Sequence, residues 1–373
     1  MSFLTPEYIS KNIPKLGFGL MRLPTTGEAT AIDLKQVEAM VDHYMDSGMN
    51  YFDTAYFYHD GKSEGAFKEA VVKRYARDLF TVADKMPIWL VEKPADVERI
   101  FNEQLERCGV DYFDFYLLHA LNGANNTKCE EMGAYEFALK MKKAGKIKSL
   151  GFSFHGTTED LEHILATHPE LEFVQLQINY YDWEFEALTH YEIARKYHKP
   201  IVIMEPVRGG FLAKMPREIE AIFKDVQPKM SIASWAIRFA SSLDGVMTVL
   251  SGMSNIEQLT DNVAYMKEFK PLSKAEATAV KQAVKALLEA PTVPCTNCKY
   301  CIDCPVEIPI FDIFSVYNNE FVNNKSVGEF KKKYAEFEAS CNASACVSCG
   351  LCESVCPQNI AIINKLADID ALT

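Results

Sequence analysis

The 373-residue sequence lacks any long apolar run, and a run such as 201–204 is far too short to cross a bilayer. Residues 1–14 mix proline with charged residues and contain no apolar segment typical of a secretory signal, so we expect a cytoplasmic protein. Positive charge is also scarce, because 39 Lys and Arg face 51 Asp and Glu, a formal net charge of −12. This balance argues against broad binding to nucleic acids or to anionic membranes. Because 48% of the residues are hydrophobic, the composition is that of a folded globular protein.

Cysteine is nearly absent from residues 1–290, which contain only Cys108 and Cys129, whereas the other nine of the 11 cysteines follow. A secreted disulfide protein would not crowd its cysteines into one quarter of such a chain. Eight of the nine form two runs, Cys295, Cys298, Cys301 and Cys304 before Pro305, and Cys346, Cys349, Cys352 and Cys356 before Pro357. Three thiolates at this spacing can surround one iron–sulfur cube, and the cysteine before proline typically reaches a second cluster. The tail therefore predicts two [4Fe–4S] clusters.

A pair of zinc ribbons is the alternative for this tail, because Cys-x2-Cys also suits tetrahedral zinc. Ribbons need two cysteine pairs separated by a loop, which neither run provides. The first run is one residue shorter before its Cys-Pro than the second, so Cys341 is either a spare thiol, as we interpret it, or a replacement for Cys304. Aromatic and aliphatic residues recur at a spacing of roughly three to four between 308 and 340, which predicts helices. Residues 291–373 thus resemble a mostly helical, ferredoxin-like domain with two clusters.

Residues 1–290 alternate short apolar segments with longer amphipathic ones. We expect strands at 16–20, 50–54, 79–84, 113–119, 149–153, 173–178, 201–204 and 245–250. Helices are expected at 34–47, 62–75, 95–108, 133–144, 159–168, 185–197, 231–240, 256–265 and 273–288. Strict alternation of eight strands with helices predicts an α/β fold, a closed (β/α)8 TIM barrel, with 290–294 as the linker to the tail. An open doubly wound sheet would favour a G-x-G-x-x-G loop after the first strand, and residues 17–22 do not match it.

Four polar residues lie near the ends of the expected strands. Asp53 ends the second strand, Lys85 follows the third, His119 ends the fourth, and Tyr58 lies in the loop after Asp53. The carboxyl ends of barrel strands meet at one mouth, where catalytic groups sit. Three different ionisable residues at the ends of three apolar strands are hard to explain by packing. These four residues are therefore the candidate catalytic group.

The run 52–58 (FDTAYFY), with Ser63-Glu64, Lys85 and Leu117-Leu118-His119, resembles the signature of the aldo-keto reductases. Further similarities over about residues 15–270 are Gly151-Phe152-Ser153, Gln177, Glu205-Pro206, Ser251-Gly252, Glu257-Gln258 and Asn262. The cysteine-rich tail is similar to the subset of that family with a C-terminal ferredoxin-like domain. The resemblance implies an oxidoreductase that interconverts a carbonyl and an alcohol by hydride transfer.

Carbonyl reduction leaves an alkoxide that must gain a proton. Tyr58 would be the acid, the Lys85 ammonium would lower its pKa, and Asp53 would hold Lys85 in place. His119 would orient the carbonyl oxygen by hydrogen bonding. Aromatic residues such as Tyr56 and Trp89 are candidates for lining the mouth, although ordinary loop packing explains each of them better.

The resemblance also implies NADP or NAD as the cofactor, lying across the barrel mouth. Ser153 and Gln177 would hold its carboxamide, while Ser251, Gly252, Gln258 and Asn262 would hold the pyrophosphate and adenosine. The other expected cofactor contacts are Gly19, Met21, Asp53 and Met204.

Two positions depart from the family pattern: Met204 stands where an aromatic residue is usual, and Phe154 where asparagine is common. No Lys or Arg lies between 250 and 262 to bind a 2′-phosphate, and Arg208 and Lys214 would need their loop to fold over. NADPH is thus favoured over NADH only weakly. No flavin motif is visible, although a barrel mouth can hold a flavin without one.

Two other functions stay open at this point. The chain could be an electron-transfer protein whose barrel is a docking or cofactor-holding scaffold, or its clusters could be purely structural supports for a small domain. The expected partners are a small carbonyl or alcohol substrate and, for electron transfer, a one-electron redox protein.

Overall fold

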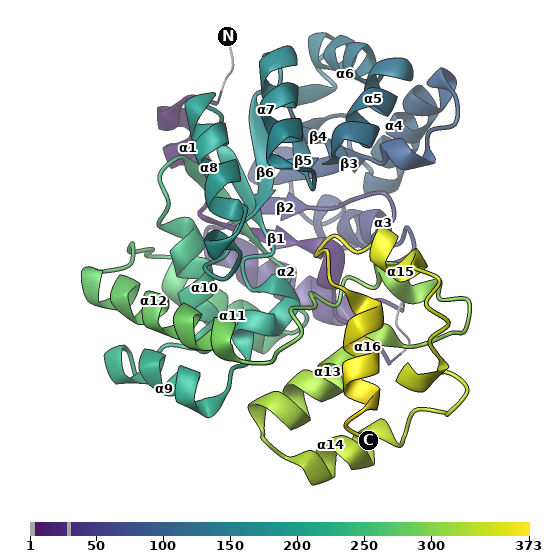
Figure 1. Cartoon of the computed structure of the whole chain (residues 1–373). Coiled ribbons are helices and arrows are strands. Elements are labelled where there is room, and N and C mark those ends of the chain that lie inside the picture. The colour runs from purple at the N-terminus through teal and green to yellow at the C-terminus, as the bar shows by residue number, and fades with distance from the viewer. Residues whose placement is uncertain (1–3, 28–30) are drawn as a thin grey trace. The chain divides into compact units, whose positions relative to one another are not determined.

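The computed structural model describes residues 4–27 and 31–373 (Figure 1). Its chain packs into two compact units, which are described separately. The first comprises Met1–Pro206 and Ile237–Pro271, and the second comprises Val207–Ala236 and Leu272–Thr373. The domain boundary between 290 and 291 stays a prediction, because this division reflects packing and not which part folds by itself.

The first unit is built on eight parallel strands. They are β1 (Leu16–Gly19), β2 (Tyr51–Asp53), β3 (Thr81–Met86), β4 (Phe113–Leu121), β5 (Ile147–Phe154), β6 (Phe173–Gln177), β7 (Ile201–Met204) and β8 (Val246–Ser251). Each strand pairs with the next in parallel, and β1 also pairs with β8, so the sheet closes in chain order. The predicted (β/α)8 barrel is confirmed, and the open doubly wound sheet is wrong.

Helices connect the strands of this unit. They are α1 (Pro6–Asn12), α2 (Leu34–Asp46), α3 (Ser63–Phe67), α4 (Pro94–Cys108), α5 (Gly123–Glu131), α6 (Ala134–Lys143), α7 (Thr158–Thr167), α8 (Ala187–Lys196) and α11 (Ile256–Met266). Local signals set their ends: the Asp33 carboxylate accepts from the Gln36 N–H at the start of α2, and Gly109 ends α4 in the left-handed region. Helix α10 (Ile232–Ser241) is divided between the two units.

Five elements of this unit differ from the sequence prediction. The expected helix at 62–75 is α3 followed by a π-helical turn, Lys68–Val72, and α1 and α5 were not foreseen. The expectation that Lys85 follows the third strand is wrong, because β3 runs from Thr81 to Met86 and Lys85 pairs in register with Leu117. The fourth strand likewise continues past His119 to Leu121, with a register irregularity after Leu118. Lys85 can occupy a strand interior because a buried carboxylate neutralises its charge.

The second unit is mostly helical. Its elements include α9 (Arg217–Val226), α12 (Lys274–Glu289), α13 (Ile310–Val316), α14 (Val327–Tyr334), α15 (Leu351–Ser354) and α16 (Ile362–Asp370), with a π-helical turn at Tyr317–Asn323. The predicted helices between 308 and 340 are confirmed, whereas α9 was not foreseen. Buried apolar side chains such as Phe314, Phe330 and Leu366 form its core, and cluster-run cysteines pack against them. Across the described residues, no helix combines the length and apolarity needed to span a bilayer.

Candidate functional site

A buried ion pair joins β2 and β3 at the carboxyl end of the barrel. The Lys85 ammonium donates to Asp53 Oδ1 at 2.6 Å and to the Thr54 carbonyl at 2.6 Å. Lys85 is 0% exposed and Asp53 2%. Burial raises the pKa of Asp53, and the Lys85 charge opposes that rise. Losing either partner would strand the other charge in the interior, so the pair holds Lys85 in one place.

Tyr58 lies beside this pair. The Lys85 Nζ is 5.1 Å from the centroid of the Tyr58 ring, which is 6.2 Å from the His119 ring in an edge-on arrangement. Burial raises the pKa of Tyr58 well above 10, and the charges of Asp53, Glu205 and Asp84 add to that rise while Arg22 opposes it. From the sequence we expected Lys85 to lower this pKa. In this structure desolvation outweighs the neighbouring cations, so the phenol stays protonated through neutral pH.

His119 is enclosed by aromatic rings. Phe57 stacks on it at 5.5 Å between centroids, and Trp89 meets it edge-on at 5.0 Å. Burial lowers the pKa of His119 well below 6.5, and the Lys85 charge lowers it further. The imidazole is therefore neutral at pH 7, with one donor and one acceptor nitrogen. Its Nδ1 has no hydrogen-bond partner within the part of the chain that the structure describes.

A second buried polar cluster, formed by Asp84, Glu64 and Cys108, adjoins Lys85 and was missed by sequence reasoning. Asp84 Oδ1 accepts from the Lys85 N–H at 2.8 Å, and the Cys108 thiol lies 3.6 Å from Asp84 Oδ2. Glu64 accepts from Arg107 at 3.3 Å, and the three side chains approach within 4.8 Å of one another. Burial raises the pKa of both Asp84 and Glu64, and the Glu64 charge raises the pKa of Asp84 further. Burial also raises the pKa of the Cys108 thiol, and the charges of both carboxylates add to that rise. The sequence signal that could have revealed this cluster is Asp84 itself, an acidic residue next to Lys85 inside an apolar strand.

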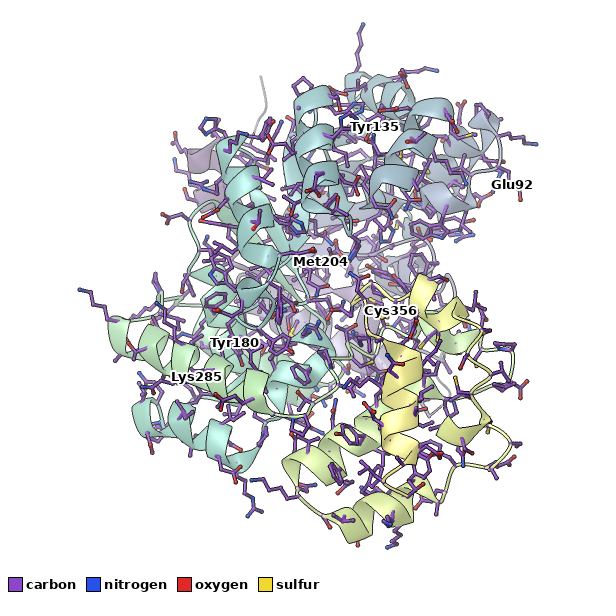
Figure 2. The ribbon with its side chains drawn as sticks, in the orientation of Figure 1. Glu92, Tyr135, Tyr180, Met204, Lys285 and Cys356 are labelled. Carbon is purple, nitrogen blue, oxygen red and sulfur yellow. The ribbon has the colours of Figure 1, made fainter. Side chains whose placement is uncertain are left out.

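The predicted cofactor residues also gather at the carboxyl ends of the strands. Gly19 ends β1, Asp53 ends β2, Ser153 lies in β5, and Gln177, Met204 and Ser251 end β6, β7 and β8, while Met21 lies in the 3₁₀ turn after β1 and Gly252 directly follows β8. Gln258 and Asn262 lie on α11. Met204 is labelled in Figure 2 at the end of its strand. Because the barrel is closed and parallel, these strand ends face one mouth.

Hydrogen bonds already orient several of these side chains. Asn262 donates to Ser251 Oγ at 2.7 Å, and the Tyr265 hydroxyl donates to Asn262 Oδ1 at 2.6 Å. Gln177 donates to Asp182 at 2.7 Å, an acidic residue that the sequence did not single out. Ser153 Oγ accepts from the Ala120 N–H at 2.8 Å and can still donate to a ligand.

An ion pair links the loops that follow β1 and β7. Arg22 lies 3.2 Å from Glu205, and its Cδ would be 3.0 Å from a Cβ placed on Gly252. The absence of a side chain at Gly252 therefore lets Arg22 lie over the end of β8. Arg208, one of the two residues suggested for a 2′-phosphate, instead belongs to the second unit, where its buried guanidinium donates to the Pro294 carbonyl.

The eight cysteines of the two runs sort into two cavities of the second unit. One cavity is lined by Cys295, Cys298, Cys301 and Cys356, and the other by Cys304, Cys346, Cys349 and Cys352. Each thus receives three cysteines from one run and the Cys-Pro cysteine from the other (Cys356 is labelled in Figure 2). Cys341 lines neither cavity.

Residues 15–285 match the model of the aldo/keto reductase family. The chain belongs to the aldo/keto reductase family. Residues 294–361 of this aldo/keto reductase match the 4Fe-4S dicluster domain. The chain is therefore an oxidoreductase that carries a C-terminal iron–sulfur domain, as the sequence predicted.

Individual relatives of this aldo/keto reductase are distant. An oxidoreductase of Bacillus subtilis, YqkF, is 22% identical over 68% of this chain and 87% of its own length. The aldo-keto reductase yakc [NADP(+)] of Schizosaccharomyces pombe is 26% identical over 57% of this chain and 63% of its own. The solved structure of a Klebsiella pneumoniae aldo-keto reductase in complex with NADPH has a TM-score of 0.60 at 21% identity, covering 72% of this chain and 90% of that one. That likeness supports the fold.

The residues of this aldo/keto reductase fit the cofactors that the sequence predicted. Four thiols around each cavity are the donor set that a [4Fe–4S] cluster requires. Burial raises the pKa of Cys295 to about 11 and of Cys301 to about 12, so cluster assembly there must release protons. At the barrel mouth, the Arg22 cation lies against Gly252 at the end of β8, where it could face an anionic dinucleotide.

Proposed function

We propose that this aldo/keto reductase interconverts a small carbonyl compound and its alcohol with NADP(H). One observation carries the proposal: Lys85, bonded to Asp53, lies beside Tyr58, and Tyr58 lies beside a neutral His119. These are a proton donor, a cation and a hydrogen-bonding group around one place where a carbonyl oxygen can sit. The NADPH complex of the Klebsiella relative supports the choice of cofactor.

Tyr58 would deliver the proton. When bound, the nicotinamide supplies the hydride, and the carbonyl oxygen gains negative charge. The raised pKa keeps the phenol protonated, and an alkoxide is basic enough to take its proton. The phenolate that remains is stabilised by the Lys85 ammonium, which Asp53 holds beside it.

His119 would position the substrate. Its neutral ring can donate one hydrogen bond to the carbonyl oxygen without introducing a second positive charge next to Lys85. Phe57 and Trp89 shield the ring from water, which strengthens that bond and favours an aromatic or apolar substrate. Ser153 and Gln177 would hold the carboxamide, while Ser251, Gly252 and Asn262 would hold the rest of the dinucleotide with Arg22.

Replacing Tyr58 by phenylalanine tests this function. We expect Tyr58→Phe to lower kcat for NADPH-dependent reduction of 4-nitrobenzaldehyde by about 10² to 10⁴-fold. NADPH affinity, measured by fluorescence titration, should stay unchanged because the ring remains. Tyr56→Phe is the matched control, because that hydroxyl donates to Glu103 on α4 at 2.7 Å. A Tyr58→Phe rate within about three-fold of the parent would remove Tyr58 from the mechanism.

A second candidate function is one-electron transfer through the clusters. Ile310 lines both four-cysteine cavities, so the two clusters would be neighbours. Such closeness favours electron exchange between the two clusters. It also favours a redox protein as the partner of this chain. An anaerobic redox titration followed by EPR tests this function. Clusters that accept no electron within the physiological range of potentials would instead be structural.

A further inference from the structure

The barrel has a cavity at the end opposite the candidate catalytic group, Asp53, Tyr58, Lys85 and His119. It is about 860 Å³ in volume and is lined by α1, the end of α8 and the segments that precede β1, β7 and β8. Lys15, Pro200 and Gly245 stand at the amino ends of those three strands, whereas Asp53 stands at a carboxyl end. Figure 1 shows α1 and α8 close together in this unit. The size lies within the range of about 300–1,000 Å³ typical of small-molecule sites.

Three cations line this cavity without a carboxylate partner. Lys15 donates to the Val246 carbonyl at 2.5 Å, and Lys199 donates to the carbonyls of Pro169 and Leu171. Neither forms an ion pair within residues 4–27 and 31–373, and the same holds for Arg195. Burial lowers the pKa of both lysines, with Asp244 opposing the shift at Lys15 and Glu170 and Glu172 opposing it at Lys199.

The acidic residues that line the cavity are already engaged. Glu172 pairs with Lys142 and accepts from Ser149 Oγ and the Leu150 N–H. Glu170 lies 3.0 Å from His168 Nδ1. The cavity is lined by four cationic side chains (Lys15, Lys142, Arg195 and Lys199) and by two carboxylates, Glu170 and Glu172, although the whole chain carries a net charge of −12. An anionic group entering here would face unneutralised positive charge.

The Arg195 guanidinium lies against the backbone of Gly245 at the cavity. A Cβ built on Gly245 would lie 2.0 Å from Arg195 Nη1, and Gly245 has a φ of +77°. The positive φ favours glycine at this position, and the missing side chain leaves the space that the guanidinium occupies. The next residue on α8, Lys196, is instead bonded to Glu162 and does not line the cavity.

The remaining lining is mainly apolar. Ile9 and Ile13 of the α1 region, Leu139, Leu171, Val246 and Met247 contribute to it. We propose that this cavity binds a small molecule that joins an anionic headgroup, a carboxylate or a phosphate monoester, to an apolar chain. The headgroup contacts Lys199 and Arg195, and the chain packs between α1 and the amino ends of β7 and β8. This site is separate from the proposed carbonyl site and does not depend on it.

Titration calorimetry of the intact, cluster-containing protein with dodecanoate, dodecyl phosphate and dodecanol tests the proposal. We expect saturable binding of at least one anionic probe, and binding at least ten-fold weaker for dodecanol, which has the chain without the charge. The two anionic probes show which headgroup the site prefers. No saturable binding of either anion, or equal binding of dodecanol, would overturn the proposal.

Variants locate the site. Arg195→Gln with Lys199→Gln should weaken binding of the preferred anion by about ten-fold or more, while Lys196→Gln, on the same helix, should leave it within two-fold. Arg195→Lys with Lys199→Arg keeps both charges and should keep most of the affinity, which controls for folding. Equal weakening by Lys196→Gln, or no weakening by the double neutral variant, would place the ligand elsewhere and refute the assignment.

Discussion

The sorting of cysteines between the two cavities makes a prediction about pairs of substitutions. Cys356 follows the second run in sequence but lines the cavity that contains Cys295, Cys298 and Cys301. A [4Fe–4S] cluster holds four irons, so the chain should hold about eight. Cys356→Ala should release about four, because it removes one of four ligands from one cluster and none from the other.

Double variants make the test decisive. Cys356 and Cys298 share a cavity, so Cys356→Ala with Cys298→Ala should still retain about four irons. Cys349 lines the other cavity, so Cys356→Ala with Cys349→Ala should retain almost none. The two double variants remove the same number of thiols and differ only in where the thiols lie.

The assay is iron and sulfide analysis of protein purified without oxygen, with EPR of the reduced samples. Cys341→Ala is the control, and its iron content should equal that of the parent because Cys341 lines neither cavity. The reasoning is refuted if the outcomes of the two double variants are reversed. That result would mean that each cluster takes its four ligands from one run. Half of the iron lost from Cys341→Ala would move that residue into the ligand set.

Three further predictions concern protons and electrons. Burial raises the pKa of Asp84 above 3.8, so the folded protein binds a proton that the unfolded chain releases. The free energy of unfolding of the parent protein therefore falls as pH rises toward the pKa that Asp84 has in the folded state, by up to about 1.4 kcal/mol per pH unit. The free energy of unfolding of Asp84→Asn, measured by urea denaturation, should therefore rise relative to that of the parent from about pH 5 to pH 8. A constant difference between the two proteins over this range would contradict the prediction. The kcat of carbonyl reduction should be flat between about pH 6 and pH 8, because Tyr58 stays protonated and His119 neutral; a fall near the ordinary histidine pKa would show that His119 titrates. NADPH alone should not rapidly reduce the clusters of flavin-free protein, because a hydride carries two electrons and each cluster accepts one. Anaerobic stopped-flow bleaching within the turnover time would disprove that.

Much of this molecule follows from local sequence signals. Eight apolar strand segments alternate with amphipathic helices, and their periodicity depends only on neighbouring residues. The candidate catalytic group could be predicted because Asp53, Lys85 and His119 each stand near the end of such a segment. The carboxyl ends of parallel barrel strands meet at one mouth. The two cysteine runs were readable because ligand spacing is a local property.

The structure alone decided the properties that depend on residues far apart in the chain. The pKa of Tyr58 rises because packing removes water from it and brings up Glu205, which no local pattern reveals. Glu64, Asp84 and Cys108 come together from α3, β3 and α4. The sequence predicted that a Cys-Pro cysteine crosses to the other cluster, but it left Cys341 as an alternative to Cys304, and the fold places Cys304 at the second cavity. The burial of a group, and the contacts between residues that are distant in the sequence, depend on how the whole chain packs. Only the tertiary structure therefore determines them.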